Sequence, residues 1–267
     1  MRTSRTGPLG RALVGLAAIL LAAAPAVPAQ QLSALAPENL AKPRPAPPFD
    51  LTGMWLHSGN ERFDPPEGFV LTPEAQVHYD AAQRAAAENK IYRNDIGLCW
   101  PAGMPIMMTR VWPVAMMQYP TAVYMIAELM NSLRVVYLDG RTHTDPDLAV
   151  PSFNGESIGR WEGDTLVIDT RHFVDHHHWI HDRLGIPASD ALRIVERVRM
   201  LEGGNRLEIE FTLTDPKAFE GEWVMTKYWN RVTDRDIAEV ECLPDLNDHM
   251  PTVQSDFNVR SLEEVQP

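Results

Sequence analysis

The sequence predicts a mainly β protein, an antiparallel β-barrel with one N-terminal helix and an irregular segment rich in methionine and proline. Three observations predict this fold class. About nine short runs rich in β-branched and aromatic residues follow one another, and most are joined by tight turns. Only one segment has a long helical pattern. The chain is long enough for one large β domain, either a barrel or a sandwich, and the run lengths favour a lipocalin-like barrel.

The N-terminal segment 1–29 has the pattern of a secretory signal peptide. Three arginines precede an apolar run at 12–24, and small residues follow at 27–29. This run is too short and too rich in alanine to favour a spanning helix, although an uncleaved anchor is the alternative. We therefore expect an exported protein, periplasmic or extracellular, that does not insert into a membrane after cleavage.

The chain is acidic, with a formal net charge of −12 when histidine is neutral. The predicted signal peptide contributes three arginines and no acid, so the mature chain is more acidic still. Such a chain is unsuited to nucleic acid and to anionic membrane surfaces, and neither is expected as a partner. The sequence leaves the oligomeric state open.

The first part of the mature chain contains the one predicted helix. Residues 30–50 hold many prolines and are expected to form a tether or to wrap an edge. The helix is predicted at 72–89, where Thr72 can cap the first turn, Pro73 suits its first position and Glu74 complements the helix dipole.

The remaining domain, residues 51–267, is predicted to be a single β-barrel. Alternation of apolar and polar residues and flanking turn residues define its strands. The predicted strands are 51–58, 121–130, 133–138, 157–161, 164–170, 191–200, 205–214, 222–231 and 236–241.

Residues 94–119 form the irregular segment, with five of the twelve methionines and with prolines that forbid a long helix or a central strand. An adaptable apolar segment of this kind is expected either to cover a cavity or to plug one end of the barrel, and copper binding by methionine is a third alternative. We predict that a mostly apolar small molecule binds in the barrel and contacts Met104, Met107 and Trp112 of this segment.

Cys99 and Cys242 are the only cysteines of the chain. In an exported protein, a single pair without CxxC spacing is predicted to form a disulfide. Two free thiols or two soft metal ligands are the alternatives.

A hairpin with a histidine-rich exit is the most distinctive stretch of the sequence. Strand-like runs at 157–161 and 164–170 flank Gly163, which supplies the positive φ of a tight turn. Five of the nine histidines follow the second run directly. If the protein has a catalytic site, this region is the first candidate.

The segment GESIGRWEGDTLVIDTRHF resembles the signature of a large family of exported bacterial proteins. The family pattern also includes an upstream DGR-x-H, matched at 139–143, a downstream ER at Glu196-Arg197, and a CxPxGMP at 99–105. The resemblance covers roughly residues 95–245 and implies a calycin-like barrel, but it brings no mechanism. Where relatives often have PHSE, this chain has PASD at 187–190.

Three hypotheses compete for the histidine region. In the first, His143, Asp169, His177 and Asp182 share a site at the barrel mouth and perform non-redox acid–base chemistry such as elimination, isomerisation or hydrolysis. Histidine suits this role because it titrates near neutrality and a carboxylate fixes its tautomer. This hypothesis needs no cofactor.

Around that site, further side chains are expected to bind the substrate. Arg141 or Arg160 would hold an anionic group, and Phe173 and Trp179 would contact an apolar part.

In the second hypothesis, His172, His176 and His178 bind a divalent metal, because their spacing fits either a helix face or one face of a strand. In the third, the histidines lie in a solvated loop and the barrel is a non-catalytic carrier of a small molecule.

Other enzyme classes are disfavoured. The chain has no GxGxxG and no Walker loop, which argues against nucleotide chemistry. Ser157 is central in a GxSxG match, but it precedes a strand within a hairpin rather than a strained strand-to-helix elbow. A serine hydrolase is therefore not expected.

Overall fold

The computed structural model describes residues 31–58 and 63–244, and the described chain forms one unit from Ser33 onward. The predicted signal peptide lies outside the described residues. Within the described part, none of the helices has the length and apolar character needed to cross a membrane.

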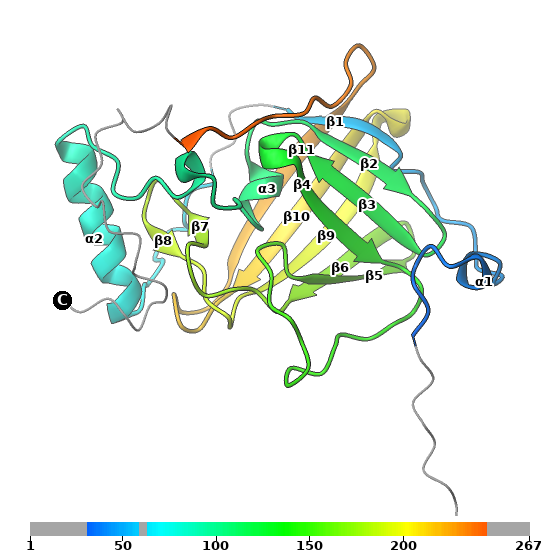
Figure 1. The fold of residues 1–267 in the computed structure, drawn as a ribbon, viewed down its shortest axis with the longest axis horizontal. Helices are drawn as coiled ribbons and strands as arrows, with labels where there is room; N and C mark the ends of the chain where they lie inside the picture. The colour runs from blue at the N-terminus through cyan, green and yellow to red at the C-terminus, as the bar shows by residue number, and fades with distance from the viewer. Residues whose placement is uncertain (1–30, 59–62, 245–267) are drawn as a thin grey trace, which may run out of the picture. The chain divides into compact units, whose positions relative to one another are not determined.

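Nine strands of the described chain close into a barrel, which confirms the predicted fold class (Figure 1). Their order around the barrel is β1-β11-β10-β9-β6-β5-β4-β3-β2. The strands are β1 (Gly53–His57), β2 (Val114–Gln118), β3 (Ala122–Ala127), β4 (Ser132–Tyr137), β5 (Glu156–Glu162), β6 (Thr165–Arg171), β9 (Arg193–Leu201), β10 (Arg206–Thr214) and β11 (Trp223–Val232).

The predicted hairpin at the centre of the sequence is present as β5 and β6. The two strands pair from Glu156 opposite Arg171 to Glu162 opposite Thr165. Gly163 in the turn has a φ of +62°. A residue with a side chain would be strained at this backbone angle, although an added Cβ would meet no atom within 4 Å.

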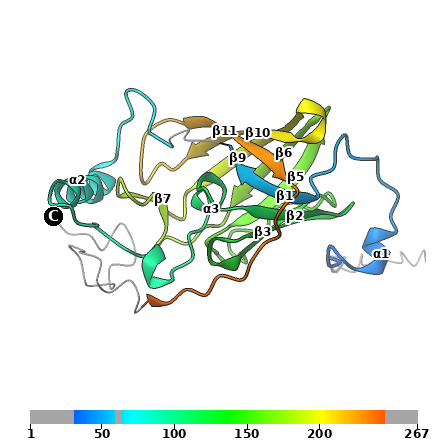
Figure 2. The ribbon, with the colours of Figure 1, turned by 90° about the horizontal axis from the view of Figure 1, so that it is seen from above.

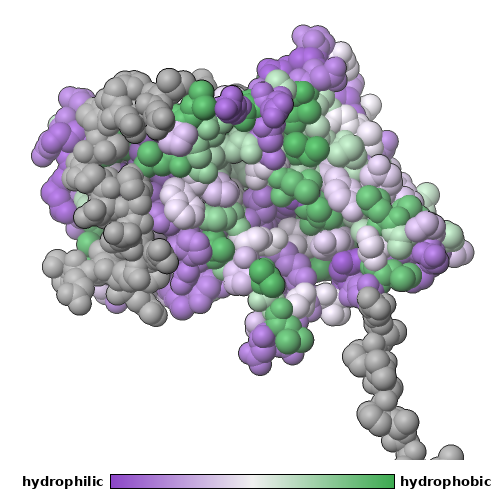
Figure 3. All heavy atoms as spheres, viewed as in Figure 1, coloured by the Kyte–Doolittle hydropathy of each residue, from purple (hydrophilic) through white to green (hydrophobic). Residues whose placement is uncertain are grey.

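One pair of neighbouring strands departs from the antiparallel expectation. β4 and β5 run parallel, with Val136 opposite Ser157 and Tyr137 opposite Ile158. Parallel neighbours need a long connection that returns to the starting end, and residues 138–155 provide it. In Figures 1 and 3 this connection projects from the lower edge of the barrel, and its exposed residues include Leu148 and Val150.

Two predicted segments need correction. The irregular segment 94–119 contains strand β2, because Pro113 and Pro120 flank that strand instead of interrupting it. The predicted strand 236–241 is not a strand, since the closed barrel leaves no free edge for it. It is held instead by the Asn131 side chain, which contacts the backbone of Ala238 and Val240.

The inward-facing side chains of the barrel strands form most of the core. Along β10 the pattern of buried and half-buried residues alternates strictly, as the sequence predicts. Met104, Met107 and Met108 join the same buried cluster as Trp55, Phe211 and other barrel residues. The methionine-rich segment, with short helix α3 (Ile106–Thr109), therefore packs into the core of the barrel domain.

The barrel interior also contains a buried polar network. The Arg134 guanidinium on β4 pairs with both carboxylate oxygens of Glu196 on β9, and both residues are almost fully buried. Arg134 also donates to Ser157 Oγ at 3.1 Å and to Thr170 Oγ1 at 3.0 Å. Ser157, the central serine of the GxSxG match, therefore lies inside a strand as a structural group.

Helix α2 (Pro73–Ala87) forms where the sequence predicts it, and Thr72 Oγ1 accepts the Ala75 N–H as the expected cap. The helix lies beside the barrel, next to a two-stranded sheet that the sequence did not predict, β7 (Trp179–His181) with β8 (Ile186–Pro187) (Figures 1 and 2). Gly185 allows the close approach, since a Cβ there would lie 2.7 Å from the His78 carbonyl oxygen.

The two ends of the described chain are tied to the barrel. Helix α1 (Pro37–Leu40) lies in the proline-rich segment, where Asn39 donates to the Asp139 carboxylate and Thr121 donates to the Ala34 carbonyl. The tail after β11, orange to red in Figure 1, reaches the predicted disulfide between Cys242 and Cys99. Short 3₁₀ turns complete the structure at Ile96–Leu98, Leu129–Asn131 and Glu202–Gly204.

Candidate functional site

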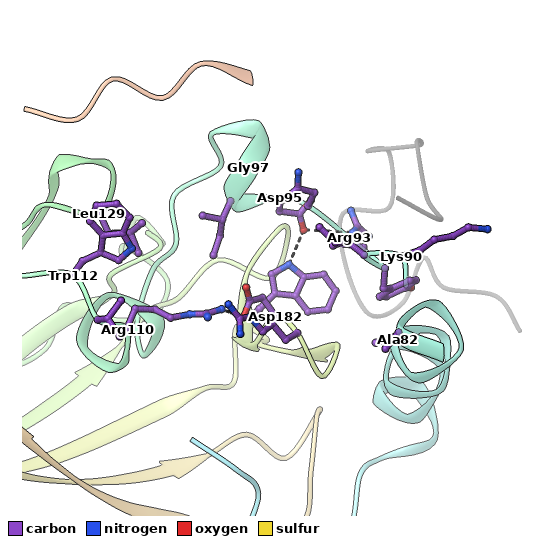
Figure 4. Close-up of a pocket in the computed structure, with 17 residues that line it drawn as sticks. Ala82, Lys90, Arg93, Asp95, Gly97, Arg110, Trp112, Leu129 and Asp182 are labelled. Atoms are coloured by element: carbon purple, nitrogen blue, oxygen red, sulfur yellow. Dashed lines mark hydrogen bonds and ion pairs between the residues drawn. The ribbon is translucent and has the colours of Figure 1, made fainter. Parts of the chain in front are cut away.

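A pocket of about 660 Å³ lies outside the barrel, between α2, residues 90–97, residues 110–112 and the β7–β8 hairpin. Trp112 and Leu129 line one side and Ala82 of α2 lines the opposite side (Figure 4). Trp112 keeps 37% of its surface exposed although it is a large apolar residue. The predicted ligand position was inside the barrel, whereas this pocket is beside it.

A buried carboxylate forms one wall of this pocket. Asp95 is 2% exposed, and its oxygens lie 3.1 Å from His177 Nδ1, 2.6 Å from Trp179 Nε1 and 3.4 Å from Arg93 Nε. His177 also stacks on the Trp100 ring at 3.9 Å between centroids. These contacts fix the position of Trp179, whose indole contributes to the pocket lining.

The charged residues around the pocket are mostly basic. Arg110 extends across it to pair with Asp182 (Figure 4). The charged lining residues are Lys90, Arg93, Asp95, Arg110, Asp182 and Arg183. In a protein with a net charge of −12, this local excess of cations favours a ligand with an anionic group.

A second cluster lies on the outer face of the barrel, at the start of β5 and the end of β6. His143 Nδ1 lies 3.0 Å from Glu156 Oε2, and His172 Nε2 lies 3.7 Å from the same oxygen. His143 Nε2 lies 3.8 Å from Asp169 Oδ2. Glu156 and Asp169 face outward because they alternate with the inward-facing Ser157 and Thr170.

Both carboxylates of this cluster are held in the ionised form. Burial alone would raise the pKa of Asp169, but hydrogen bonds from Arg193 and Arg171 outweigh burial and lower it to about 2. Burial also opposes ionisation of Glu156, but hydrogen bonds from Thr144 and His143 hold its pKa below the usual range. The cluster therefore combines two imidazoles with two carboxylates.

The structure divides the four predicted acid–base residues between these two places. His143 and Asp169 belong to the outer cluster, while His177 contacts Asp95 and Asp182 pairs with Arg110. The chain after His172 turns into the β7–β8 hairpin, which packs on α2. The sequence could not show this change of direction.

The two arginines predicted to bind an anion are engaged in local ion pairs. Arg141 donates to Asp139 at 2.8 and 2.6 Å and lies over the Tyr137 ring. Arg160 pairs with Glu162 next to it on the exposed face of the hairpin. Glu162 also pairs with Arg197 of β9, so Arg160 belongs to an exposed group of three ion-paired side chains.

The predicted apolar contact residues have different surroundings. Met104, Met107 and Phe173 are buried in the main core, with at most 1% of their surface exposed. Trp112 and Trp179 line the pocket beside the barrel, and their role in ligand binding stays a prediction.

The three histidines predicted as metal ligands also separate. His172 joins the outer cluster, whereas partly exposed His176 lies beside Asp175. His178 is buried, with Nε2 2.7 Å from the Met104 carbonyl oxygen, and burial lowers its pKa to about 4. The structure instead brings His172 together with His143 and Glu156.

Sequence reasoning missed Glu156, Asp95 and Arg110. For Glu156 the strand pattern contains a usable signal, since it occupies the same outer face as Asp169 on paired strands. Asp95 and Arg110 both lie in the irregular segment 94–119, Arg110 directly after α3, where no periodicity predicts which side chains meet.

No protein-family profile matches the chain, and no curated protein matches it significantly. The family resemblance of the β5–β6 hairpin therefore remains a prediction.

Proposed function

We propose that the protein binds a small amphiphilic molecule, with an apolar body and an anionic group, in the pocket beside the barrel. The observation that carries this proposal is the pocket itself. Its volume of about 660 Å³ suits a small-molecule ligand, and it exposes apolar side chains that a folded protein otherwise buries.

The charge of the lining supports the anionic part of the ligand. Arg183 is exposed at the pocket, and among the described residues Arg110 forms an ion pair with Asp182 alone. An arginine can bind a ligand carboxylate in a bidentate manner while keeping part of its contact with Asp182. A tightly bound ligand would therefore need both an anionic end for the arginines and an apolar body that packs against the two tryptophans of the pocket.

The proposal keeps the carrier hypothesis and leaves acid–base catalysis out, because the four expected catalytic residues have contacts in two separate places. We also propose export. The Cys99–Cys242 disulfide supports it, since thiols of cytosolic proteins are kept reduced.

The test is a titration of tryptophan fluorescence with dodecanoate, with dodecanol as the uncharged counterpart. We expect saturable binding of dodecanoate and weaker binding of dodecanol. Trp112→Ala and Arg110→Ala should each weaken dodecanoate binding about tenfold, which corresponds to about 1.4 kcal/mol.

Arg160→Ala is the matched control, because Arg160 is an exposed, ion-paired arginine on β5 outside the pocket. Its affinity for dodecanoate should equal that of the wild type. Equal affinities in all three variants would place the binding site elsewhere and contradict the proposal.

A further inference from the structure

Three metal-ligating side chains meet on the outer face of the barrel from three separate segments. His143 comes from the β4–β5 connection, Glu156 is the first residue of β5, and His172 follows β6 directly. Each offers one ligand atom, and these atoms all lie within 4.8 Å of one another. None of the three lines the pocket, so this site is independent of the proposed ligand-binding function.

The spacing of these atoms matches a metal site. Ligand atoms about 2.0–2.2 Å from a tetrahedral zinc ion lie about 3.4 Å from each other. The distances from Glu156 Oε2 to His143 Nδ1 and to His172 Nε2 are 3.0 and 3.7 Å, on either side of that value. Small rotations of the side chains would therefore suffice to coordinate one ion.

The His172 ring also has an unused donor or acceptor. Its Nε2 is buried, and within the described part of the chain it has no hydrogen-bond partner. The nearest oxygen of Glu156, at 3.7 Å, is too far for a hydrogen bond. A buried polar atom without a partner is costly unless a water or an ion satisfies it, and this atom faces a carboxylate.

The surrounding residues would orient the ligands. Thr144 donates to both oxygens of Glu156, from its backbone N–H at 2.8 Å and its hydroxyl at 2.7 Å. Asp169 lies 3.8 Å from His143 Nε2, the ring nitrogen opposite the proposed ligand atom, and Arg171 and Arg193 hold this carboxylate in place. At 3.8 Å this contact is not yet a hydrogen bond, and within the described residues His143 Nε2 has no hydrogen-bond partner. In zinc sites a ligating imidazole usually donates its second ring N–H to such a carboxylate, and the small ring rotation needed for coordination would bring Nε2 and Asp169 together.

We propose that His143 Nδ1, Glu156 Oε2 and His172 Nε2 bind one divalent cation of the zinc class. Two imidazoles and one carboxylate select Zn²⁺, Co²⁺ or Cu²⁺ over Mg²⁺ and Ca²⁺, which prefer oxygen ligands. Three protein ligands leave the fourth position of a tetrahedral ion open to water or to an external ligand. The site is partly accessible, since the three side chains keep 13–22% of their surface exposed.

The test uses the full chain purified without a histidine tag and stripped with a chelator. Isothermal titration with ZnCl₂ should show one equivalent bound, and Co²⁺ should give the strong visible absorption of four-coordinate cobalt. His143→Ala, His172→Ala and Glu156→Gln should each weaken Zn²⁺ binding at least tenfold and abolish the cobalt spectrum. Asp169→Asn, behind His143, should weaken Zn²⁺ binding about 10- to 100-fold.

His176→Ala is the matched control, because this partly exposed histidine lies beside Asp175 and outside the cluster. It should bind Zn²⁺ like the wild type, and the melting temperature of each stripped variant will show that it is folded. Absence of Zn²⁺ and Co²⁺ binding by the wild type would overturn the proposal. Binding that survives all three ligand substitutions but not His176→Ala would also overturn it.

Discussion

At the scale of single residues, five histidines between His172 and His181 have five different surroundings. His172 faces Glu156, His176 is partly exposed, and His177 stacks on Trp100. His178 is buried against backbone carbonyls, and His181 stacks on Phe63. Their chemistry follows from these surroundings, and a run of histidines in a sequence does not reveal it.

For His178 the surroundings predict a dependence of stability on pH. Burial lowers its pKa from 6.5 to about 4 in the folded protein, although the Met104 and Val174 carbonyls partly oppose this. Below pH 6.5 the unfolded chain binds a proton that the folded chain does not, so stability is lost as the pH falls toward 4. The contribution lost between pH 7.5 and pH 5 is about 2 kcal/mol.

Urea unfolding at the two pH values checks this prediction. His178→Asn should show a smaller loss of unfolding free energy by about 2 kcal/mol, because its side chain does not titrate. His176→Asn, two residues away and partly exposed, should behave like the wild type. An equal loss in His178→Asn and wild type would show that His178 does not titrate in this way.

At the scale of elements, we expect the largest loss of stability from breaking the buried Arg134–Glu196 pair between β4 and β9. Arg134→Met would leave the Glu196 carboxylate buried without its partner inside the barrel, which costs about 3–5 kcal/mol. The double variant Arg134→Met/Glu196→Leu removes both charges and should recover much of that loss.

Chemical denaturation of the single and double variants measures these changes in unfolding free energy. Arg197→Ala is the control on the same strand, since its ion pair with Glu162 is exposed and should contribute at most about 1 kcal/mol. If the double variant is less stable than Arg134→Met, the loss of stability does not come from the unpaired Glu196 carboxylate. It would then come from the lost hydrogen bonds of Arg134 to Ser157 and Thr170.

The same scale shows what the sequence could predict. Helix α2 was predictable because its signals are local, from the Thr72 cap to the alanine-rich body. Strands β9 and β10 were predictable because alternation marks their two faces. Strand β2, the loss of a strand at 236–241 and the direction of β5 depend on pairing across the closed sheet, which no local pattern records.

The candidate sites follow the same division. His143 and Asp169 were expected together because paired strands bring their ends to one place, and they are near each other. The pocket was missed because it forms between α2 and an irregular segment, where sequence periodicity says nothing about contact.

At the scale of the whole molecule, the Cys99–Cys242 disulfide closes a loop across a sequence separation of 143 residues. Constraining so long a loop in the unfolded chain is worth up to about 5 kcal/mol in the chain-entropy description. We expect the Cys99→Ser/Cys242→Ser variant to be less stable by up to this amount in urea unfolding.

Reduced wild-type protein is the matching control, because it should unfold at the same urea concentration as the double serine variant. Mass spectrometry after alkylation without reduction should find no modified thiol in the native protein. Two alkylated thiols would contradict the disulfide in the purified protein.

The pairing of β1 with β11 has a consequence for how the protein is made. The first strand of the barrel begins at Gly53, and its neighbour ends at Val232. Strand β11 lies between β1 and β10 in the closed sheet. Until β11 has been synthesised, β1 and β10 each have an unpaired edge. Unpaired strand edges can pair with other chains and lead to aggregation. The barrel can therefore close only after nearly the whole described chain has been synthesised.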